Sequence, residues 1–323
     1  MNTLLLKNSD SHCVKIASSF LNQGDLVALP TETVYGLAAD ATNREAVRKI
    51  FDVKKRPLGH PLIMHFSDIS ELKPWVKEIP DQVFLLAKHC WPGPLSLLLN
   101  KSNLVMNDIT GGSSKVCVRI PNHPTTREII HHLGRPIVAP SANLFGGVSP
   151  TCAEHVLHDL NGRIAMIVDG GECGIGLEST ILDMTTPQPL LLRPGGYSLP
   201  DLEMILGSKI LLQPEHQTKV SGNLLNHYQP NTKLLSVSRE RMMELCQNSN
   251  FSARSTFMVL GDIKDYRFNK YKMPTDAKSY GQILYAVLRM LDKAGLDEIF
   301  IETPPNNADW MAVNDRISKA THK

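Results

Sequence analysis

Short apolar segments separated by turn residues recur through the first 200 residues, and this pattern restricts the fold more than any other feature. The segment at 25–30, DLVALP, follows the turn residue Gly24 and is typical of a buried β-strand. The same pattern predicts strands at 61–66, 95–100, 115–120, 136–141, 163–169, 179–184 and 189–193. So many strands with few helices favour an α/β domain of mixed strand direction.

One helix is predicted after the first strand from its own end signals. Residues 42–45, Thr-Asn-Arg-Glu, match a capping box and predict a helix that begins at Thr42. Apolar residues at positions 46, 47, 50 and 51 give this helix one apolar face. Pro57 requires the helix to end before it.

The pattern weakens between about 200 and 230, which suggests two domains in a chain of 323 residues. The stretch 213–231 is polar and aperiodic, as linkers are. Strands at 255–261 and 298–303, an apolar helix face at 283–291 and a last helix at 312–321 follow it. We predict a first domain over 1–205, a linker over 206–232 and a smaller Rossmann-like α/β domain over 233–323.

Composition argues against several classes of protein. The chain has 34 Lys and Arg against 32 Asp and Glu, so any basic site must be local. Its six cysteines form no C-x-x-C pair, and no secretory leader is recognisable, which predicts reduced thiols in the cytoplasm. No apolar stretch approaches the ~18 residues of a membrane helix, and no Walker A or G-x-G-x-x-G nucleotide motif is complete.

Polar residues gather where the apolar strands end. Thr31 to Thr33 follow the first strand, Ser141 and Asn143 follow another, and Ser179 and Arg193 stand at the ends of two more. Each Ser, Thr or Asn taken alone is a common turn former. As a set they indicate a ligand pocket, because pockets form at the strand ends of α/β sheets.

Two groups of cations have two interpretations each. Lys54 and Arg56 either offset the dipole of the predicted helix or bind phosphates. Lys115 and Arg119 share one face of their strand, which fits an anion site or a solvated surface. His60 and His65 flank a strand without the Cys or His partners of a zinc site, so we predict no metal-ligating residues.

Six ordered motifs carry a specific resemblance. They are PTETVYGL (30–37), KKRP with PLI (54–57 and 61–63), VRIP (118–121), SAN (141–143), ESTI (178–181) and LRPG (192–195). They resemble the motifs of the YrdC-like family of threonylcarbamoyl-AMP synthases and cover about residues 10–195. HYQP (227–230) and AVNDR (312–316) resemble the extra C-terminal domain of the family's long form.

The resemblance implies a twisted open sheet with a deep, positively lined cavity and assigns residues to two ligands. Lys54 and Arg56 would be the catalytic cations on the ATP phosphates. The other implied ATP contacts are His60, Lys115, Ser141, Asn143, Ser149, Arg193 and Tyr228, with Tyr228 closing the site from the linker. Thr33, His65, Arg119, the backbone of Ala139 and Ser179 would surround threonine.

The implied reaction forms L-threonylcarbamoyl-AMP and pyrophosphate from L-threonine, bicarbonate or CO2, and ATP. Mg2+ would accompany ATP, and no organic cofactor is implied. A tRNA threonylcarbamoyl transferase would receive the product and modify an adenosine in tRNA. Neither a membrane nor strong direct nucleic-acid binding is expected.

The linker departs from the family pattern at two places. The chain has Val220-Ser221-Gly222 where Ser-Pro-Gly is usual, and uncharged residues at 223–226 where basic ones are common. An RNA-binding or ribosome-assembly factor that uses the same basic cavity is the alternative, although aromatic residues make up only 6% of the chain. A carbamoyl-transferring enzyme is a second alternative, but no accessory module for it is visible.

Overall fold

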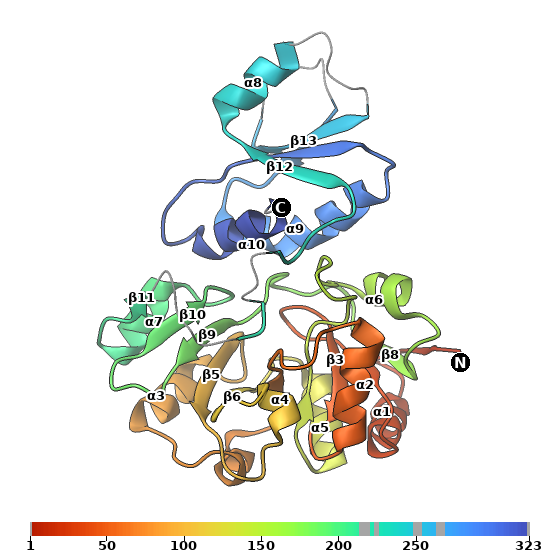
Figure 1. The fold of residues 1–323 in the computed structure, drawn as a ribbon, viewed down its shortest axis with the longest axis vertical. Helices are drawn as coiled ribbons and strands as arrows, with labels where there is room; N and C mark the ends of the chain where they lie inside the picture. The colour runs from red at the N-terminus through yellow and green to blue at the C-terminus, as the bar shows by residue number, and fades with distance from the viewer. Residues whose placement is uncertain (1, 213–219, 223–225, 248–253, 263–268, 322–323) are drawn as a thin grey trace. The chain divides into compact units, whose positions relative to one another are not determined.

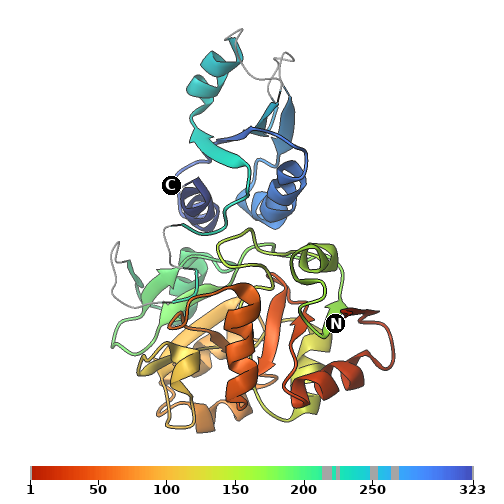
Figure 2. The same cartoon turned by 45° about the vertical axis from the view of Figure 1, so that its right-hand side comes forward.

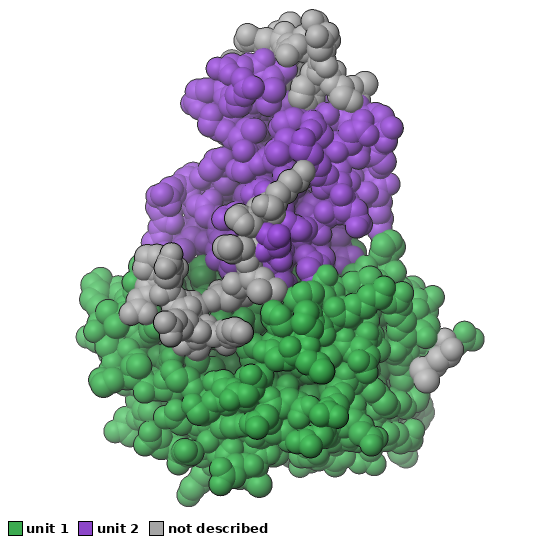
Figure 3. All heavy atoms as spheres, viewed as in Figure 1, with its two compact units in different colours: residues 1–145, 149–223 green, residues 146–148, 224–323 purple. Residues whose placement is uncertain are grey.

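The computed structural model describes residues 2–212, 220–222, 226–247, 254–262 and 269–321. Parts of the predicted linker, 213–219 and 223–225, therefore lie outside the described residues. The chain forms two compact units, one from residues 1–145 and 149–223 and the other from residues 146–148 and 224–323 (Figure 3). Each unit is described by itself.

The first unit is built on an eleven-stranded sheet with the order β1-β8-β2-β3-β7-β4-β6-β5-β9-β10-β11 (Figure 1). The strands are β1 (Leu4–Lys7), β2 (Val27–Leu29), β3 (Gly36–Asp40), β4 (Ile63–His65), β5 (Leu95–Asn100), β6 (Lys115–Arg119), β7 (Ile137–Val138), β8 (Met166–Asp169), β9 (Thr180–Asp183), β10 (Leu190–Arg193) and β11 (Leu211–Leu212). Five neighbouring pairs are parallel and five antiparallel. The predicted mixed strand direction is confirmed.

Seven α-helices and two 3-10 turns connect these strands in the described part of the first unit. They are α1 (Cys13–Asn22), α2 (Arg44–Lys54), η1 (Ile69–Glu71), η2 (Lys73–Trp75), α3 (Asp81–Cys90), α4 (Asn107–Thr110), α5 (Pro124–Leu133), α6 (Ala153–Leu160) and α7 (Leu199–Leu206). Two of them, α1 and α5, lie side by side against the sheet in both views (Figures 1 and 2). Their apolar residues form one buried core with β2, β3 and β8.

The helix predicted at residue 42 begins one position later than expected. Asn43 is the N-cap, and its side-chain oxygen accepts hydrogen bonds from the backbone N–H of Glu45 and Ala46. Thr42 instead donates its hydroxyl to Asp40. Asn43 rather than Thr42 is the N-cap because its side-chain carbonyl oxygen reaches the N–H groups of both Glu45 and Ala46 in the first turn. The predicted end before Pro57 is confirmed by the last helical residue, Lys54.

Each predicted strand segment contains a strand, but most of these strands are shorter than predicted. The segment 136–141 shows the reason, because only Ile137 and Val138 pair as a strand. Beyond Val138 the pairing is reduced to an isolated bridge between Ser141 and Gly36 and to the carbonyl oxygen of Pro140, which accepts from the N–H of Leu37. Apolar residues continue beyond the strand since the loop is itself partly buried.

The second unit contains a four-stranded sheet whose pairs are all parallel, in the order β12-β15-β13-β14. Its elements are β12 (Lys233–Val237), α8 (Arg239–Gln247), β13 (Ser255–Leu260), β14 (Lys270–Met273), α9 (Ala277–Asp292), β15 (Glu298–Glu302) and α10 (Met311–Thr321). The strands and helices predicted after residue 255 are confirmed. Leu284, Val287, Leu288 and Leu291 form the buried face of α9, as their spacing predicts.

Candidate functional site

Strand register brings several candidate residues to one face of the central sheet. Lys115, Cys117 and Arg119 alternate on one face of β6. His65 is the parallel partner of Arg119, and Ile63 is the partner of Cys117. Register partners project to the same side of a sheet, so Arg119 and His65 are immediate neighbours.

The same face continues across β5, β9 and β10. Leu98 is the partner of Cys117 on β6 and of Asp183 on β9. Ile181, two residues before Asp183, is the partner of Arg193 on β10. Arg193 therefore lies on the face that carries Lys115 and Arg119. Three strands, β6, β9 and β10, contribute charged residues to this face from positions far apart in the sequence, and β4 adds His65.

Arg119 is buried and held from two sides. Its Nη2 donates to Glu32 Oε1 at 2.7 Å, and its Nε donates to the carbonyl oxygen of Gly93 at 3.2 Å. The second oxygen of Glu32 accepts from the backbone N–H of Asn122 at 3.0 Å. This arrangement fixes the plane of the guanidinium group, which a bidentate carboxylate site needs. Glu32 was not among the predicted site residues, although it stands inside the PTET motif.

His65 is neutral over the physiological pH range. Burial, and then the positive charge of Arg119, lower the pKa of His65 to about 3. Its Nδ1 lies 3.1 Å from the carbonyl oxygen of Ile63, which can only accept, so Nδ1 carries the hydrogen. Nε2 of the neutral ring is then a hydrogen-bond acceptor.

Thr33 and Ala139 come from loops next to this face. Thr33 is fully buried in the loop between β2 and β3, and its hydroxyl lies 2.8 Å from that of Thr31. Ala139 follows β7, and its N–H donates to Ile63 at 3.1 Å. A side chain on Gly36 would stand 3.1 Å from the Cβ of Ala139, so the two loops are closely packed there.

Lys54 joins the C-terminal end of α2 to the Ser141 loop. It is 1% exposed, and its ammonium group donates to the carbonyl oxygens of Ser141 (2.5 Å) and Asn143. The side-chain amide of Asn143 donates to the carbonyl oxygen of Leu144 at 2.7 Å. Lys54, Ser141 and Asn143 thus form one cluster that fixes the loop after β7.

Arg56 and His60 lie around the ring of Phe145. The Arg56 guanidinium carbon is 5.5 Å from the centre of that ring, and the His60 ring is 5.3 Å from it, edge to face. Nη2 of Arg56 also donates to the carbonyl oxygen of Pro61 at 3.0 Å. These contacts group Arg56 and His60 at the loop that leaves α2.

Two carboxylates that were not predicted hold two predicted residues. Lys115 forms a 2.7 Å ion pair with Asp183, whose side chain is 2% exposed. Ser149 is fully buried and donates to Glu178 Oε1 at 2.6 Å. Glu178 begins the ESTI motif and Asp183 follows it. The only sequence signal for either was its position, Glu178 within the motif and Asp183 just after it, and that signal is weak.

Ser179 and Arg193 form a hydrogen-bonded group at the start of β9. Nε and Nη2 of Arg193 donate to the carbonyl oxygen of Ser179 at 3.0 and 2.8 Å, and Nη2 also reaches its hydroxyl. Nη1 donates to the carbonyl oxygen of Ser221 at 2.8 Å. The Ser179 hydroxyl lies 2.7 Å from that of Ser96. Ser96, on β5, was not predicted because a single serine inside an apolar strand has no distinguishing pattern.

The described linker residues 220–222 lie on this face. Val220 joins the apolar cluster of Ile63, Leu98, Cys117 and Ile181. Next to it, a cavity of about 10 Å³ is bordered by Lys115, Pro61 and Ser221, among other residues. Burial raises the pKa of the Cys117 thiol to about 12, so this thiol is not ionised near neutral pH.

Tyr228 belongs to the second unit and packs within it. It has a φ of 64°, a left-handed conformation that is unusual for a bulky residue. Its ring stacks on Tyr285 at 5.6 Å, and the guanidinium group of Arg316 lies 5.2 Å from the ring centre. These contacts explain why the backbone is held in this conformation.

Among the described residues, no group of three or more His, Cys, Asp or Glu side chains could hold a metal ion. No helix in the described part of the chain is long and apolar enough to cross a membrane.

The fold is similar to that of solved structures. The crystal structure of P. abyssi Sua5 complexed with L-threonine matches with a TM-score of 0.92 and 36% identity. The match covers 99% of this chain and 98% of that one. The chain is thus a two-domain α/β protein with the Sua5-like fold, in which a large mixed sheet is followed by a parallel four-stranded unit.

Sequence comparisons identify the family. Residues 19–195 match the family described as "Telomere recombination", and residues 197–321 match the threonylcarbamoyl-AMP synthase C-terminal domain. The threonylcarbamoyl-AMP synthase of Pyrococcus abyssi is 38% identical, with 95% of this chain and 94% of the relative aligned. That of Bacillus subtilis is 38% identical, with 94% and 91% aligned. The chain belongs to the threonylcarbamoyl-AMP synthase family, in its long form with both domains.

Proposed function

We propose that this enzyme makes L-threonylcarbamoyl-AMP and pyrophosphate from L-threonine, bicarbonate or CO2, and ATP, for the threonylcarbamoyladenosine of tRNA. The observation that carries the proposal is the common sheet face of Arg119, His65, Lys115 and Arg193. Lys115, Arg119 and Arg193 supply cations to this face, and cations suit a reaction that brings two anions together.

The reaction has two steps. The threonine amine attacks the carbon of CO2 or bicarbonate and loses a proton. With bicarbonate this proton leaves together with the displaced hydroxide as one molecule of water, and with CO2 it is released as such. A carboxylate oxygen of the N-carboxythreonine then attacks the α-phosphorus of ATP, and the bond to pyrophosphate breaks. That carboxylate is ionised at neutral pH, so the second step needs no general base. Alignment and charge stabilisation remain as the tasks of the protein.

Threonine binds beside Arg119 in this proposal. Arg119 binds the carboxylate, and Glu32 keeps the guanidinium group in position by its 2.7 Å ion pair. The neutral ring of His65 offers Nε2 as an acceptor, while Thr33, Ser179 and the Ala139 backbone complete the pocket. A hydrogen bond to the threonine hydroxyl would select against valine, because an unsatisfied buried partner is costly.

ATP binds along the neighbouring part of the same face, in the deep basic cavity implied by the family resemblance. Arg56 is the principal phosphate ligand, and Lys54 acts with it while fixing the Ser141 loop. The other proposed contacts are His60, Lys115, Ser141, Asn143, Ser149 and Arg193. The closeness of Arg56 and His60 around Phe145 supports a common phosphate region.

Mg2+ enters with ATP as part of the substrate. The described residues present no acidic or histidine cluster for it, so the phosphate oxygens are its natural ligands. Its role is to neutralise phosphate charge as pyrophosphate leaves. No protein residue is assigned to the metal.

The linker over 206–232 acts as a lid between a catalytic domain, 1–205, and a Rossmann-like domain, 233–323, with Tyr228 closing over ATP. The support for this proposal is the resemblance of the HYQP sequence at 227–230 to the long form of the family. The enzyme works in the cytoplasm and passes its product to a tRNA threonylcarbamoyl transferase.

The decisive experiment incubates the protein with labelled bicarbonate, threonine and ATP. A labelled adenylate that requires threonine and appears together with pyrophosphate is the expected result. Valine in place of threonine should give much less product. Arg56→Ala should abolish product formation while the circular dichroism spectrum is unchanged, and near-normal product from that variant would contradict the phosphate assignment.

A further inference from the structure

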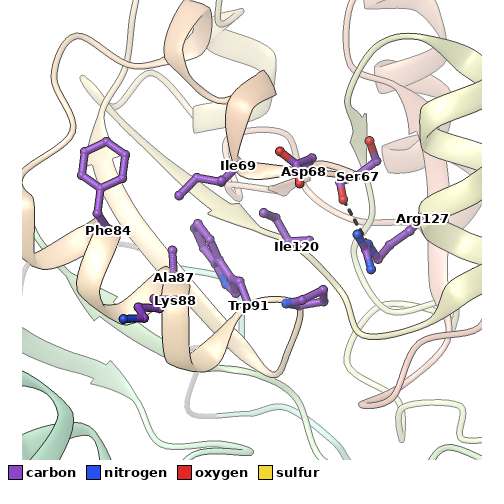
Figure 4. A pocket seen from close by; sticks show the side chains of 10 residues that line it. Ser67, Asp68, Ile69, Phe84, Ala87, Lys88, Trp91, Ile120 and Arg127 are labelled. Atoms are coloured by element: carbon purple, nitrogen blue, oxygen red, sulfur yellow. Dashed lines mark hydrogen bonds between the residues drawn. The ribbon is translucent and has the colours of Figure 1, made fainter.

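A second cavity of about 250 Å³ lies in the first unit, apart from the residues assigned to threonine and ATP. One part of its wall is apolar, with Ile69, Trp91 and Ile120 around the hollow (Figure 4). Phe84 and Arg127 lie at opposite ends of the same view. The volume is near the lower limit of small-molecule sites, so a single ring with a short substituent fits it.

The aromatic wall is rigid. The indole N–H of Trp91 donates to the carbonyl oxygen of Leu95 at 2.7 Å, which fixes the ring plane. Phe84 is 51% exposed and continues the apolar surface at the rim. A fixed flat ring beside aliphatic side chains favours a planar apolar ligand.

The opposite part of the cavity is cationic. Arg127 is anchored by its Nε, which donates to the carbonyl oxygen of Ser67 at 3.0 Å. Within the described part of the chain, no carboxylate lies within ion-pair distance of Arg127 or of Lys88, which is exposed at the rim. The nearby carboxylate of Asp68 is occupied by the N–H and hydroxyl of Ser70, at 2.9 and 2.7 Å. The hydrogen bonds from Ser70, and to a smaller extent the charge of Arg127, lower the pKa of the Asp68 carboxyl, so this cavity also holds a carboxylate. Arg127 has a fixed orientation and presents its cation without a direct ion pair.

We propose that this cavity is a binding site for a small aromatic carboxylate, with its ring against Trp91 and its carboxylate on Arg127. The proposal depends on both parts of the cavity, the apolar wall and the cation of Arg127, since the apolar wall alone would accept any hydrophobic molecule. The charge adds a requirement for an anion, and the volume restricts the ligand to about one ring.

The cavity shares backbone with Arg119. The N–H of Gly93 donates to the carbonyl oxygen of Ile120, a lining residue, at 2.8 Å. The carbonyl oxygen of Gly93 accepts from Arg119 at 3.2 Å. A ligand that moves the Trp91–Gly93 segment thus moves a partner of Arg119, and we expect it to change threonine affinity. This consequence, unlike the binding itself, rests on the proposed function.

The test measures binding of 4-fluorophenylacetate to the full-length protein by fluorine NMR. We expect a dissociation constant on the order of 1 mM, appropriate to a fragment of this size. The neutral 2-(4-fluorophenyl)ethanol should bind at least about tenfold more weakly, and fluoroacetate, which lacks the ring, should not bind. Absence of binding up to about 10 mM would overturn the proposal.

Variants locate the site. Arg127→Met should weaken fluorophenylacetate at least about tenfold and leave the neutral alcohol unchanged, while Arg127→Lys should retain most of the binding. Ala87→Leu, which extends into the cavity, should weaken both probes. Arg163→Met, at an exposed arginine outside the cavity, is the control, and melting temperatures check that every variant is folded. Equal binding by wild type, Arg127→Met and Ala87→Leu would overturn the assignment.

Threonine affinity is measured by calorimetry with and without saturating fluorophenylacetate. A change of about threefold or more is expected in the wild type and not in Arg127→Met. An unchanged affinity while the probe binds would refute the connection to Arg119. Failure of threonine to bind at all would count against the proposed function and leave the probe result intact.

Discussion

At the scale of single residues, the site depends on charges that are buried and held by specific partners. Lys54 is bound by two carbonyl oxygens of the loop after β7, and Arg119 by a carboxylate and a carbonyl oxygen. Buried charges persist only where such partners satisfy them. Removing one partner therefore affects both stability and geometry.

Replacement of Lys54 tests its role in fixing the Ser141 loop. Lys54→Met leaves two carbonyl oxygens without their donor, and we expect the free energy of unfolding to fall by about 2 kcal/mol or more. Lys55→Met is the matched control, because Lys55 is the next residue in the chain and its side chain is exposed. Chemical denaturation measures both, and equal stabilities would show that the loop does not need Lys54.

The buried neutral state of His65 predicts a pH dependence of stability. The unfolded chain takes up a proton near pH 6.5, whereas native His65 does so only near pH 3, so the unfolded state binds more protons between these values. Stability contributed by His65 is therefore present above pH 6.5 and is lost as pH falls toward 3. The slope from this residue approaches about 1.4 kcal/mol per pH unit.

Denaturation of wild type and His65→Gln between pH 4 and 7 measures this effect. The variant should show a shallower loss of stability at acid pH, because its glutamine does not titrate. His89→Gln, at an exposed histidine of α3, should retain the slope of the wild type. Parallel slopes for wild type and His65→Gln would contradict the buried neutral state.

At the scale of elements, the loop after β10 packs directly on the start of β9. A Cβ on Gly195 would stand 2.3 Å from the carbonyl oxygen of Glu178 and 2.4 Å from the backbone nitrogen of Thr180. Both atoms are backbone, so the clash cannot be relieved by a side-chain rotation. This close approach holds the segment that carries Ser179 against β10 and Arg193.

Gly195→Ala is expected to separate these two segments. We predict a loss of about 2–4 kcal/mol in the free energy of unfolding and a large loss of adenylate formation. Gly174→Ala is the control, since a Cβ there meets nothing within 4 Å. Thermal unfolding and the labelled-bicarbonate assay measure both variants, and a Gly195→Ala protein as stable as Gly174→Ala would refute the packing argument.

At the scale of the whole molecule, the linker contacts and the second unit make separable contributions. Val220 and the carbonyl oxygen of Ser221 pack within the first unit, whereas Tyr228 packs within the second. A truncation that removes both sets of contacts would not distinguish them. Two truncated chains that end at different residues can separate the two sets of contacts.

We predict different results for chains that end at residue 205 and at residue 222. The longer form keeps Ser221, which accepts a hydrogen bond from Arg193, and Val220, which belongs to the apolar cluster. It should therefore melt at a higher temperature. Both forms lack Tyr228, and both should show a KM for ATP raised at least about tenfold if the lid proposal is correct. Steady-state kinetics measure this, and an unchanged KM in the longer form would refute the lid.

The sequence by itself determined the presence of most strands, the apolar faces of α2 and α9 and the candidate residues, because these follow from local periodicity and motif spelling. The strand β3, Gly36–Asp40, was not predicted, because its sequence GLAAD has little β-propensity. It is a strand because it pairs with β2 and β7 on either side. Glu32 was named only as one of the polar residues after the first strand, and the polar partners Glu178, Asp183 and Ser96 were missed.

Only the tertiary structure decided how the charges are paired. Glu32 and Arg119 are 87 residues apart in the chain, as are Lys54 and Ser141. Their contacts depend on strand order and register, which local patterns do not encode. The low pKa of His65 likewise comes from burial and, to a smaller extent, from the charge of Arg119 on the next strand. The sequence therefore gives which side chains are available for the site. Their protonation and orientation are set by the fold, because both depend on the groups that surround each side chain in space.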